Sequence, residues 1–116
     1  MELTREYLPA TEGARQELVL LHGWGSNREV WRPMLAALRP WANISLVELP
    51  GCAPGCGDDA GLGLGDLLDG IEACSPARAV FIGWSLGGQL AVELATRNPE
   101  RVAAVVTLCS NPCFVA

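Results

Sequence analysis

The chain has 116 residues, a formal net charge of -5 at pH 7, a hydrophobic content of 50% and a charged content of 18%. This length and balance predict one globular domain and disfavour intrinsic disorder. No apolar run reaches the roughly 18 residues of a membrane span, so we expect none. All 8 basic residues are arginine, which excludes a P-loop lysine and lysine Schiff-base chemistry from this sequence. The acidic balance argues against a nucleic-acid partner.

The amino-terminal residues 1–6 have neither the cationic region nor the apolar stretch of a secretory signal, which predicts a cytoplasmic location and reduced thiols. The 5 cysteines are an odd number, which disfavours a disulfide framework. A four-thiolate zinc site would need the pairs Cys52/Cys56 and Cys109/Cys113. Neither pair has the two-residue spacing of most zinc knuckles, so we expect small reduced cysteines and no metal or other cofactor.

Apolar runs typical of buried strands alternate with helical patterns along the chain. We expect strands at residues 18–21, 44–47, 79–82 and 103–106. A first helix should begin after Ser26, which forms a Ser-x-x-Glu capping box with Glu29, and should end at Pro40. Its apolar residues, at the spacing of one helix face, are Trp31, Met34, Leu35 and Leu38.

Residues 51–65 are rich in Gly, Pro, Asp and Cys and predict a flexible loop. A second helix should carry an apolar face at positions 64, 67, 68 and 71, and a third should run from about Leu86 to Arg97, where Asn98-Pro99 ends it. Each gap between strands is long enough for a crossover. The sequence therefore predicts an α/β fold, a parallel sheet of about four strands with helices on both faces.

The segment Gly83-Trp84-Ser85-Leu86-Gly87-Gly88 directly follows the third expected strand and opens the third helix. A Gly-x-Ser-x-Gly nucleophile elbow requires this context, because its sharp turn leaves no room for side chains two residues before and after the serine. The serine hydroxyl then projects above the sheet. Ser85 is our candidate nucleophile.

A second glycine-containing segment, His22-Gly23-Trp24-Gly25, follows the first expected strand. Acyl transfer needs two N–H donors aimed at the developing oxyanion, one from the residue after the nucleophile and one from an upstream loop. The backbone amides of Leu86 and Trp24 are the candidates. His22, Gly23 and Trp84 are candidates for the lining of the substrate pocket.

These segments, with Glu48-Leu49-Pro50-Gly51 between them, resemble the amino-terminal half of an α/β-hydrolase. Within that superfamily, the Gly-Trp-Gly loop, Trp84 and the segment Ser110-Asn111-Pro112-Cys113-Phe114 resemble the family of pimeloyl-[acyl-carrier protein] methyl ester esterases of biotin synthesis. The match runs from about Leu18 to Phe114.

The resemblance implies a serine carboxylester hydrolase that removes a methyl group from a pimeloyl chain and releases methanol. It implies that Ser85 is the nucleophile, that the Trp24 and Leu86 amides form the oxyanion hole, and that acyl carrier protein is a partner. Some bacteria fuse such an esterase to the methyltransferase that adds the ester, so the native polypeptide could be longer.

One departure from the pattern concerns the proton acceptor. α/β-Hydrolases supply an acid and a histidine after the serine, but this sequence has a single histidine, His22, which precedes Ser85. A role in shaping the oxyanion loop is favoured for His22 over that of a substitute base. We interpret residues 1–116 as a partial α/β-hydrolase domain without the lid and the acid–base region, which would be fused to it or associate with it. The isolated chain should be inactive.

The remaining candidates have simpler interpretations. Glu93 and Glu100 follow Ser85 but are expected to be solvated charges, and Arg28, Arg32 and Arg39 are expected to be a solvated helix face sooner than a docking site for an acidic carrier protein. Gly61-x-Gly63-x-Gly65 lacks the dinucleotide-binding spacing.

Two alternative functions stay open: an α/β-hydrolase esterase or lipase with another substrate, and a non-catalytic binding or scaffold domain.

Overall fold

The computed structural model describes residues 3–23, 25–49 and 63–109. In chain order the elements are β1 (Thr4–Leu8), β2 (Gln16–Leu21), the 3-10 helix η1 (Arg28–Met34), α1 (Leu35–Leu38), β3 (Ala42–Glu48), α2 (Leu64–Ala73), β4 (Ala79–Trp84), α3 (Leu86–Arg97), the 3-10 helix η2 (Pro99–Arg101) and β5 (Val102–Leu108). The four expected strands and the expected limits of the third helix are confirmed.

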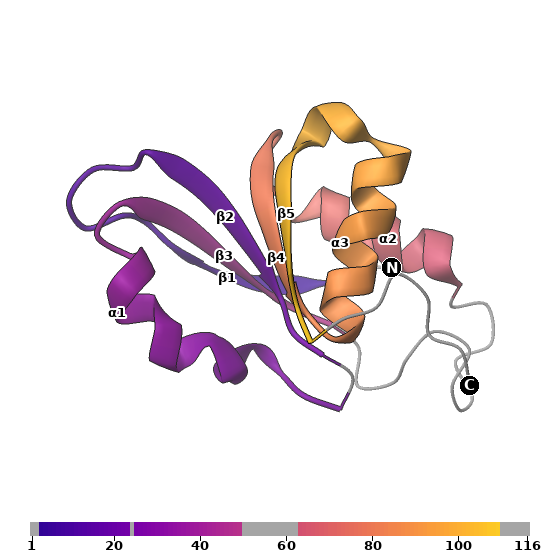
Figure 1. Cartoon of the computed structure of the whole chain (residues 1–116), viewed down its shortest axis with the longest axis horizontal. Helices are drawn as coiled ribbons and strands as arrows, with labels where there is room; N and C mark the ends of the chain where they lie inside the picture. Colours follow the sequence, from indigo (N-terminus) through magenta and orange to yellow (C-terminus); the bar gives the residue numbers. More distant parts are fainter. Residues whose placement is uncertain (1–2, 24, 50–62, 110–116) are drawn as a thin grey trace.

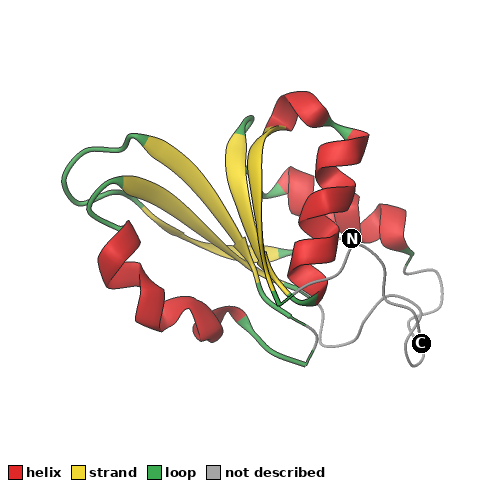
Figure 2. Ribbon diagram, viewed as in Figure 1, coloured by secondary structure: helices red, strands yellow, loops and turns green. Residues whose placement is uncertain are grey.

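The strands form one sheet in the order β1-β3-β2-β4-β5. β2 is parallel to both β3 and β4, and β4 is parallel to β5, whereas β1 is antiparallel to β3. η1 and α1 lie on one face of the sheet, and α2 and α3 lie on the other (Figures 1 and 2). The predicted α/β class, with helices on both faces, is therefore confirmed.

Alternate residues of β2 face two different cores, as the pleat of a strand requires. Leu18 and Leu20 pack in a cluster with Trp31 and Leu35 on the side of η1 and α1. Val19 and Leu21 pack on the opposite side, in a cluster that includes residues of α2 and α3 such as Leu67, Ile71, Leu90 and Leu94. Because residues Leu18–Leu21 of β2 are buried on both faces, this part of the strand is continuously apolar.

The prediction of a parallel sheet of about four strands holds for β2, β3, β4 and β5, but it missed β1. None of the five residues of β1 is buried, and Tyr7 is 43% exposed, so the strand has no apolar run or clean alternation to mark it. Its position comes from backbone pairing with β3, in which Glu6 is opposite Leu46. The described sheet is thus mixed and has a polar edge strand.

The predicted first helix and its capping box were wrong in detail. Asn27, not Ser26, is the N-cap, and its side-chain oxygen accepts a hydrogen bond from the Glu29 N–H at 2.9 Å. The first seven residues form a 3-10 helix that contains Pro33, and only Leu35–Leu38 is α-helical. Proline has no N–H to donate to the carbonyl four residues earlier, which disfavours a regular α-helix at that point.

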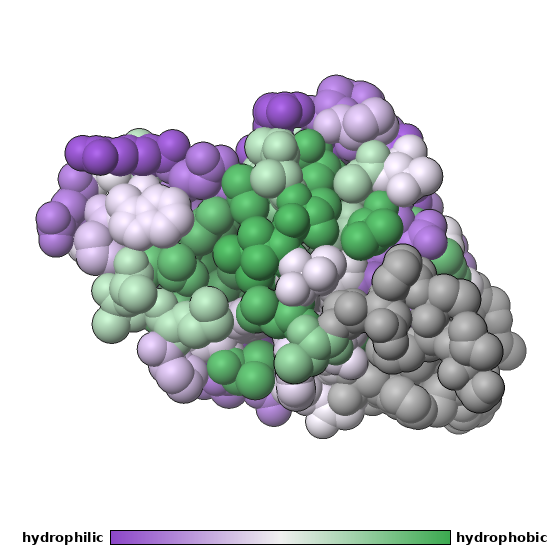
Figure 3. All heavy atoms as spheres, in the orientation of Figure 1, coloured by the Kyte–Doolittle hydropathy of each residue, from purple (hydrophilic) through white to green (hydrophobic). Residues whose placement is uncertain are grey.

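The sheet face that carries η1 and α1 is only partly covered. Figure 3 shows an apolar surface between α1 and α3, over β4 and β5. Val106 in β5 is 43% exposed, and Val80 and Leu108 are partly buried residues at the border of the nearby core. None of the helices in the described ranges is both long and apolar enough to cross a membrane.

Candidate active site

The candidate site lies where the direction of the chain changes in the sheet. β2 and β4 are neighbours in the sheet. The chain leaves β2 toward β3, on the side of β2 away from β4, and leaves β4 toward β5, on the side of β4 away from β2. The two connections that leave the carboxyl ends of β2 and β4 therefore separate. In open α/β sheets such a switch point forms the crevice in which ligands bind. Gly23 follows β2 and Ser85 follows β4 at this edge.

Ser85 occupies a sharp turn between β4 and α3. Its φ of 56° and ψ of -116° belong to a backbone region that favours glycine, so a serine here is strained. The backbone around it is tied down: the Ser85 N–H donates to the Leu108 carbonyl at 2.9 Å, and the Ser85 carbonyl accepts from the N–H groups of Gly88 and Gln89. This geometry is that of the predicted nucleophile elbow.

Two glycines allow the elbow to form. A Cβ atom on Gly83 would overlap the Gly87 carbonyl, and a Cβ atom on Gly87 would overlap the Leu21 carbonyl at the end of β2. The first turn of α3 therefore approaches two strands more closely than any side chain would permit. This contact is the physical reason for the Gly-x-Ser-x-Gly spacing.

The neighbours of Ser85 extend to opposite faces of the sheet. Trp84 packs against the core on the η1 side, and Leu86 packs against the core on the α2 and α3 side. Leu86 is the first residue of α3. The first N–H groups of a helix have no acceptor within the helix, so the Leu86 amide is suited to bind an oxyanion.

The loop after β2 lies directly against the elbow. A Cβ atom on Gly23 would be 3.2 Å from the Ser85 Cβ and 3.1 Å from the Trp84 ring, so the backbone of Gly23 runs alongside the candidate nucleophile. His22 is buried, and its Nδ1 lies 2.8 Å from the Gly23 carbonyl. Trp24, the other candidate oxyanion donor, lies outside the described residues. The structure thus brings together His22, Gly23, Trp84, Ser85 and Leu86.

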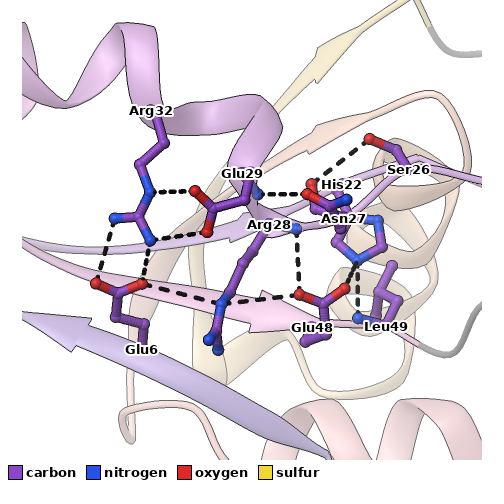
Figure 4. A network of polar contacts seen from close by, with 9 residues as sticks. All are labelled: Glu6, His22, Ser26, Asn27, Arg28, Glu29, Arg32, Glu48 and Leu49. Atoms are coloured by element: carbon purple, nitrogen blue, oxygen red, sulfur yellow. Dashed lines mark hydrogen bonds and ion pairs between the residues drawn. The ribbon is translucent and has the colours of Figure 1, made fainter.

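A network of charged side chains borders this loop (Figure 4). Glu48, at the end of β3, has one carboxylate oxygen 3.3 Å from the Arg28 backbone N–H and the other 3.4 Å from His22 Nε2. Arg32 bonds both Glu6 and Glu29, and these hydrogen bonds hold the pKa of each carboxyl below its usual value. β1, η1 and β3 are joined through this network.

Sequence reasoning gave Glu48 no role beyond membership of a motif. The sequence signal that could have identified Glu48 is its position. It is an acidic residue at the carboxyl end of a buried strand, at the same edge of the sheet as His22. Periodicity could not identify the partners of Glu48, because they lie 20 or more positions away in the chain.

Of the residues for which the sequence gave simpler interpretations, Arg28 borders this site through Glu48, and no contact described brings Glu93 or Glu100 to it. Glu93 is exposed on α3, and Glu100 is exposed on η2. Arg28 and Arg32 form ion pairs with carboxylates of Glu6, Glu29 and Glu48, so much of their charge is balanced within the molecule. Arg39 is partly buried.

The cysteine pairs proposed for zinc are only partly described. Cys109 is an exposed free cysteine, and Cys52, Cys56 and Cys113 lie outside the described residues. Among residues 3–23, 25–49 and 63–109, no group of three or more His, Cys, Asp or Glu side chains is placed to hold a metal ion. Gly61 also lies outside these ranges, while Gly63 is the N-cap of α2.

A mixed sheet with a strained serine elbow at its switch point defines the hydrolases of the α/β class. The model of the alpha/beta hydrolase family matches residues 18–116, and the chain belongs to that family. The elbow, the preceding strand and the following helix all lie within the matched part.

The chain is similar to two curated pimeloyl-[acyl-carrier protein] methyl ester esterases. It is 45% identical to that of Pectobacterium carotovorum subsp. carotovorum (strain PC1) over 107 residues, which are 91% of this chain and 42% of the relative. It is 42% identical to that of Edwardsiella ictaluri (strain 93-146), with 88% of this chain and 39% of the relative covered. The chain thus spans about two fifths of the length of these relatives.

A solved structure shares the fold. The crystal structure of a hydrolase from Pseudomonas aeruginosa superposes with a TM-score of 0.76 at 26% identity, and the match covers 97% of this chain and 43% of that one. The resemblance noted in the sequence, both to the superfamily and to the esterase family, is confirmed by these comparisons.

The close approach at Gly87 predicts a large effect of a single methyl group. Gly87→Ala should lower the free energy of unfolding by at least about 2 kcal/mol, because the new Cβ meets backbone atoms at the end of β2 that cannot rotate away. Gly65→Ala is the matched control: Gly65 lies within α2 with nothing near its Cβ position, so stability should rise by up to about 1 kcal/mol. Denaturant unfolding measures both, and equal effects would contradict the argument.

The ion pairs of Arg32 predict a pH-dependent contribution to stability. A lowered carboxyl pKa stabilises the fold at a pH above the unfolded value, and this contribution is lost as the pH falls through the folded value. Arg32→Met should therefore raise the pKa of Glu6 and Glu29 toward their usual value, as followed by NMR titration of the side-chain carboxyl carbons. The stability difference from the wild type should vanish at low pH. Arg15→Met, which removes a distant charge, should leave the pKa of Glu6 where it is.

Proposed function

We propose that the whole protein is a serine carboxylester hydrolase that acts on the methyl ester of a pimeloyl chain carried by acyl carrier protein. The observation that carries the proposal is the strained Ser85 elbow, with the Gly23 backbone against it, in a chain that is 45% identical to a named esterase of this specificity. Residues 1–116 would be one part of the hydrolase domain.

In this mechanism the Ser85 hydroxyl attacks the ester carbonyl carbon. The carbonyl oxygen becomes an oxyanion, and the amides of Leu86 and Trp24 donate hydrogen bonds to it, assisted by the positive end of the α3 dipole. The C–O bond to the methoxy group then breaks, the methoxy oxygen takes a proton, and methanol leaves. Water hydrolyses the resulting acyl-enzyme to release the free carboxylate and restore Ser85.

The proton acceptor for Ser85 comes, in this proposal, from residues outside these 116. An imidazole must lie within hydrogen-bond reach of the serine, and the one imidazole of this sequence has its ring nitrogens 2.8 Å from the Gly23 carbonyl and 2.9 Å from the Leu49 amide nitrogen. His22 is thus engaged with the backbone on both sides. Its favoured role in shaping the loop is supported by these contacts.

The apolar side chains beside the elbow favour an acyl substrate. Trp84 is half-buried, adjoins Gly23 and presents apolar surface close to Ser85, which suits the methylene chain of a pimeloyl group. The esterase names of the relatives supply the carrier protein as partner. We further propose that the protein is cytoplasmic. Residues 1–116 would be covalently continuous with the region that carries the catalytic acid and histidine, or would associate with it.

Replacement of the nucleophile tests the reaction class. In the whole native protein, Ser85→Ala should lower kcat for methanol release from pimeloyl-[acyl-carrier protein] methyl ester at least about 1,000-fold, because the acyl-enzyme route is lost. Glu93→Gln, an exposed substitution on α3, should change kcat less than about twofold. Full activity of Ser85→Ala would refute the proposal. Ser85-dependent cleavage of short soluble esters alone would show that the proposed substrate is wrong and that the reaction class is right.

A polypeptide of residues 1–116 alone should show no ester turnover. It contains the nucleophile and one described oxyanion donor but no second histidine, so any residual rate enhancement would come from binding and the oxyanion hole. Release of methanol or p-nitrophenol by this polypeptide, measured against its Ser85→Ala variant, provides the check. Turnover that depends on Ser85 would contradict the assignment of the base to other residues.

A further inference from the structure

A hollow of about 340 Å³ opens at the amino ends of the central strands. Its volume is within the range of small-molecule sites, roughly 300–1,000 Å³. Residues 14–17, which include the first two residues of β2, form one wall, and Arg78 before β4 and Ala103 in β5 form the other. Ser85 follows the carboxyl end of β4, so the hollow is at the opposite edge of the sheet from the candidate active site.

The hollow exists because β2 and β4 separate before their amino ends. Backbone pairing between them begins at Leu18 and Val80, and the two residues before Leu18 pair with β3. Figure 1 shows β2 and β4 diverging toward their amino ends. The register of β5 on β4 shifts next to Ala79, which leaves Ala103 as an extra residue. Such a bulge bends the strand locally and interrupts the ladder. The space is therefore a feature of the sheet itself.

The two arginines of the lining differ from the other exposed arginines in the described ranges. Arg32 and Arg97 form ion pairs with carboxylates, and Arg5 lies over an aromatic ring. Arg78 has no ion pair within the described residues and donates from Nη1 to a backbone carbonyl at 2.7 Å. The Arg15 side chain has neither an ion pair nor a hydrogen bond there. Guanidinium donors on both walls are thus available to a ligand.

The lining contains one carboxylate, that of Glu17. Its Oε2 accepts a hydrogen bond from Asn43 Nδ2 at 2.8 Å, and Asn43 Oδ1 accepts from the Ala10 N–H at 2.8 Å. Its Oε1 is buried without a hydrogen-bond partner. The Glu17 carboxylate is therefore held toward β3. With two positive charges and one negative, the lining has a net charge of +1 in a chain whose net charge is -5.

These groups suit an oxyanion. A guanidinium offers a fork of two N–H donors that fits two oxygens of one group. A carboxylate has two oxygens and is matched by one fork, whereas a phosphate group has three strong acceptor oxygens and a charge of about -1.5 to -2 at pH 7. A phosphate group can thus receive donors from both walls at once. A cationic ligand would instead meet two like charges.

We propose that this hollow binds a phosphate group, with Arg15 donating to it from the β2 wall and Arg78 from the β4 wall. The Gln16 amide, also in the lining, offers a neutral donor. The ligand is inorganic phosphate or a small phosphate monoester, since the volume leaves room for little more than the group and a short substituent. The site is independent of the hydrolase reaction.

The test is a titration of the whole native protein with potassium phosphate, followed by carbon-13 NMR of the arginine Cζ atoms. The Cζ signals of Arg15 and Arg78 should shift with one dissociation constant of about 1–10 mM, because two solvated forks hold a small anion only weakly. Potassium chloride at equal ionic strength should cause no saturable shift of either signal, since screening is not binding.

Three arginine variants locate the site. Arg15→Gln and Arg78→Gln should each weaken phosphate binding at least about fivefold, as followed on the Cζ signal of the remaining arginine, because each removes a fork and a positive charge. Arg5→Gln is the matched control: it removes an exposed arginine from β1 and should change the dissociation constant less than about twofold. Melting temperatures without phosphate, expected to be similar to that of the wild type, show that all three variants are folded.

Removal of the one negative charge tests the electrostatics in the opposite direction. Glu17→Gln should tighten phosphate binding about threefold, because a nearby repulsion is lost. The glutamine side-chain oxygen can still accept from Asn43, so the wall keeps its hydrogen bond. Weaker binding in Glu17→Gln would contradict the proposed charge balance.

Glycerol 3-phosphate distinguishes the two sources of the phosphate group. Tighter binding than that of inorganic phosphate identifies a monoester as the ligand, equal binding identifies the phosphate group alone, and both results uphold the site. Equal shifts in phosphate and chloride, or a dissociation constant that is unchanged in both Arg15→Gln and Arg78→Gln, would overturn it. Ser85-dependent hydrolysis is measured separately, so neither result bears on the proposed function.

Discussion

The arrangement of the site depends on one close approach, that of the first turn of α3 to the end of β2. Gly87 lies so near the Leu21 carbonyl that no side chain fits between them, and Gly83 and Gly87 meet in the same way across the elbow. This contact bends the chain sharply at Ser85 and brings it beside Gly23. The position of Ser85, the amino terminus of α3 and the proximity of Gly23 thus follow from a single steric condition.

Features that depend on local steric or hydrophobic patterns were predictable from the sequence. The elbow followed from two glycines around Ser85, and β2 followed from an apolar run because both of its faces are buried. β1 was missed because its pairing with β3 uses backbone groups, which any sequence has. Ser26 and Asn27 are both residue types that favour the N-cap position. Only the folded backbone decides that Asn27 caps η1, by accepting a hydrogen bond from the Glu29 N–H.

The site was predictable to a similar extent. Sequence motifs identified candidate residues that the structure brings together, but the contacts of His22 with Glu48 and Leu49 join positions 26 and 27 residues apart, and no spacing rule connects them. The polar surroundings of the loop after β2 are therefore a tertiary property. They also explain why charged residues of η1, expected to face solvent, are engaged with carboxylates of β1 and β3.

The backbone strain at Ser85 has an evolutionary consequence. A serine with φ of 56° destabilises the fold by about 1–3 kcal/mol relative to an unstrained residue, and glycine would remove most of this strain. Selection for stability alone would thus favour glycine at position 85, and only selection for a hydroxyl group retains serine. In a descendant that kept the fold but was freed from selection for this hydroxyl group, position 85 should be among the first to drift, and its drift toward glycine would record that release.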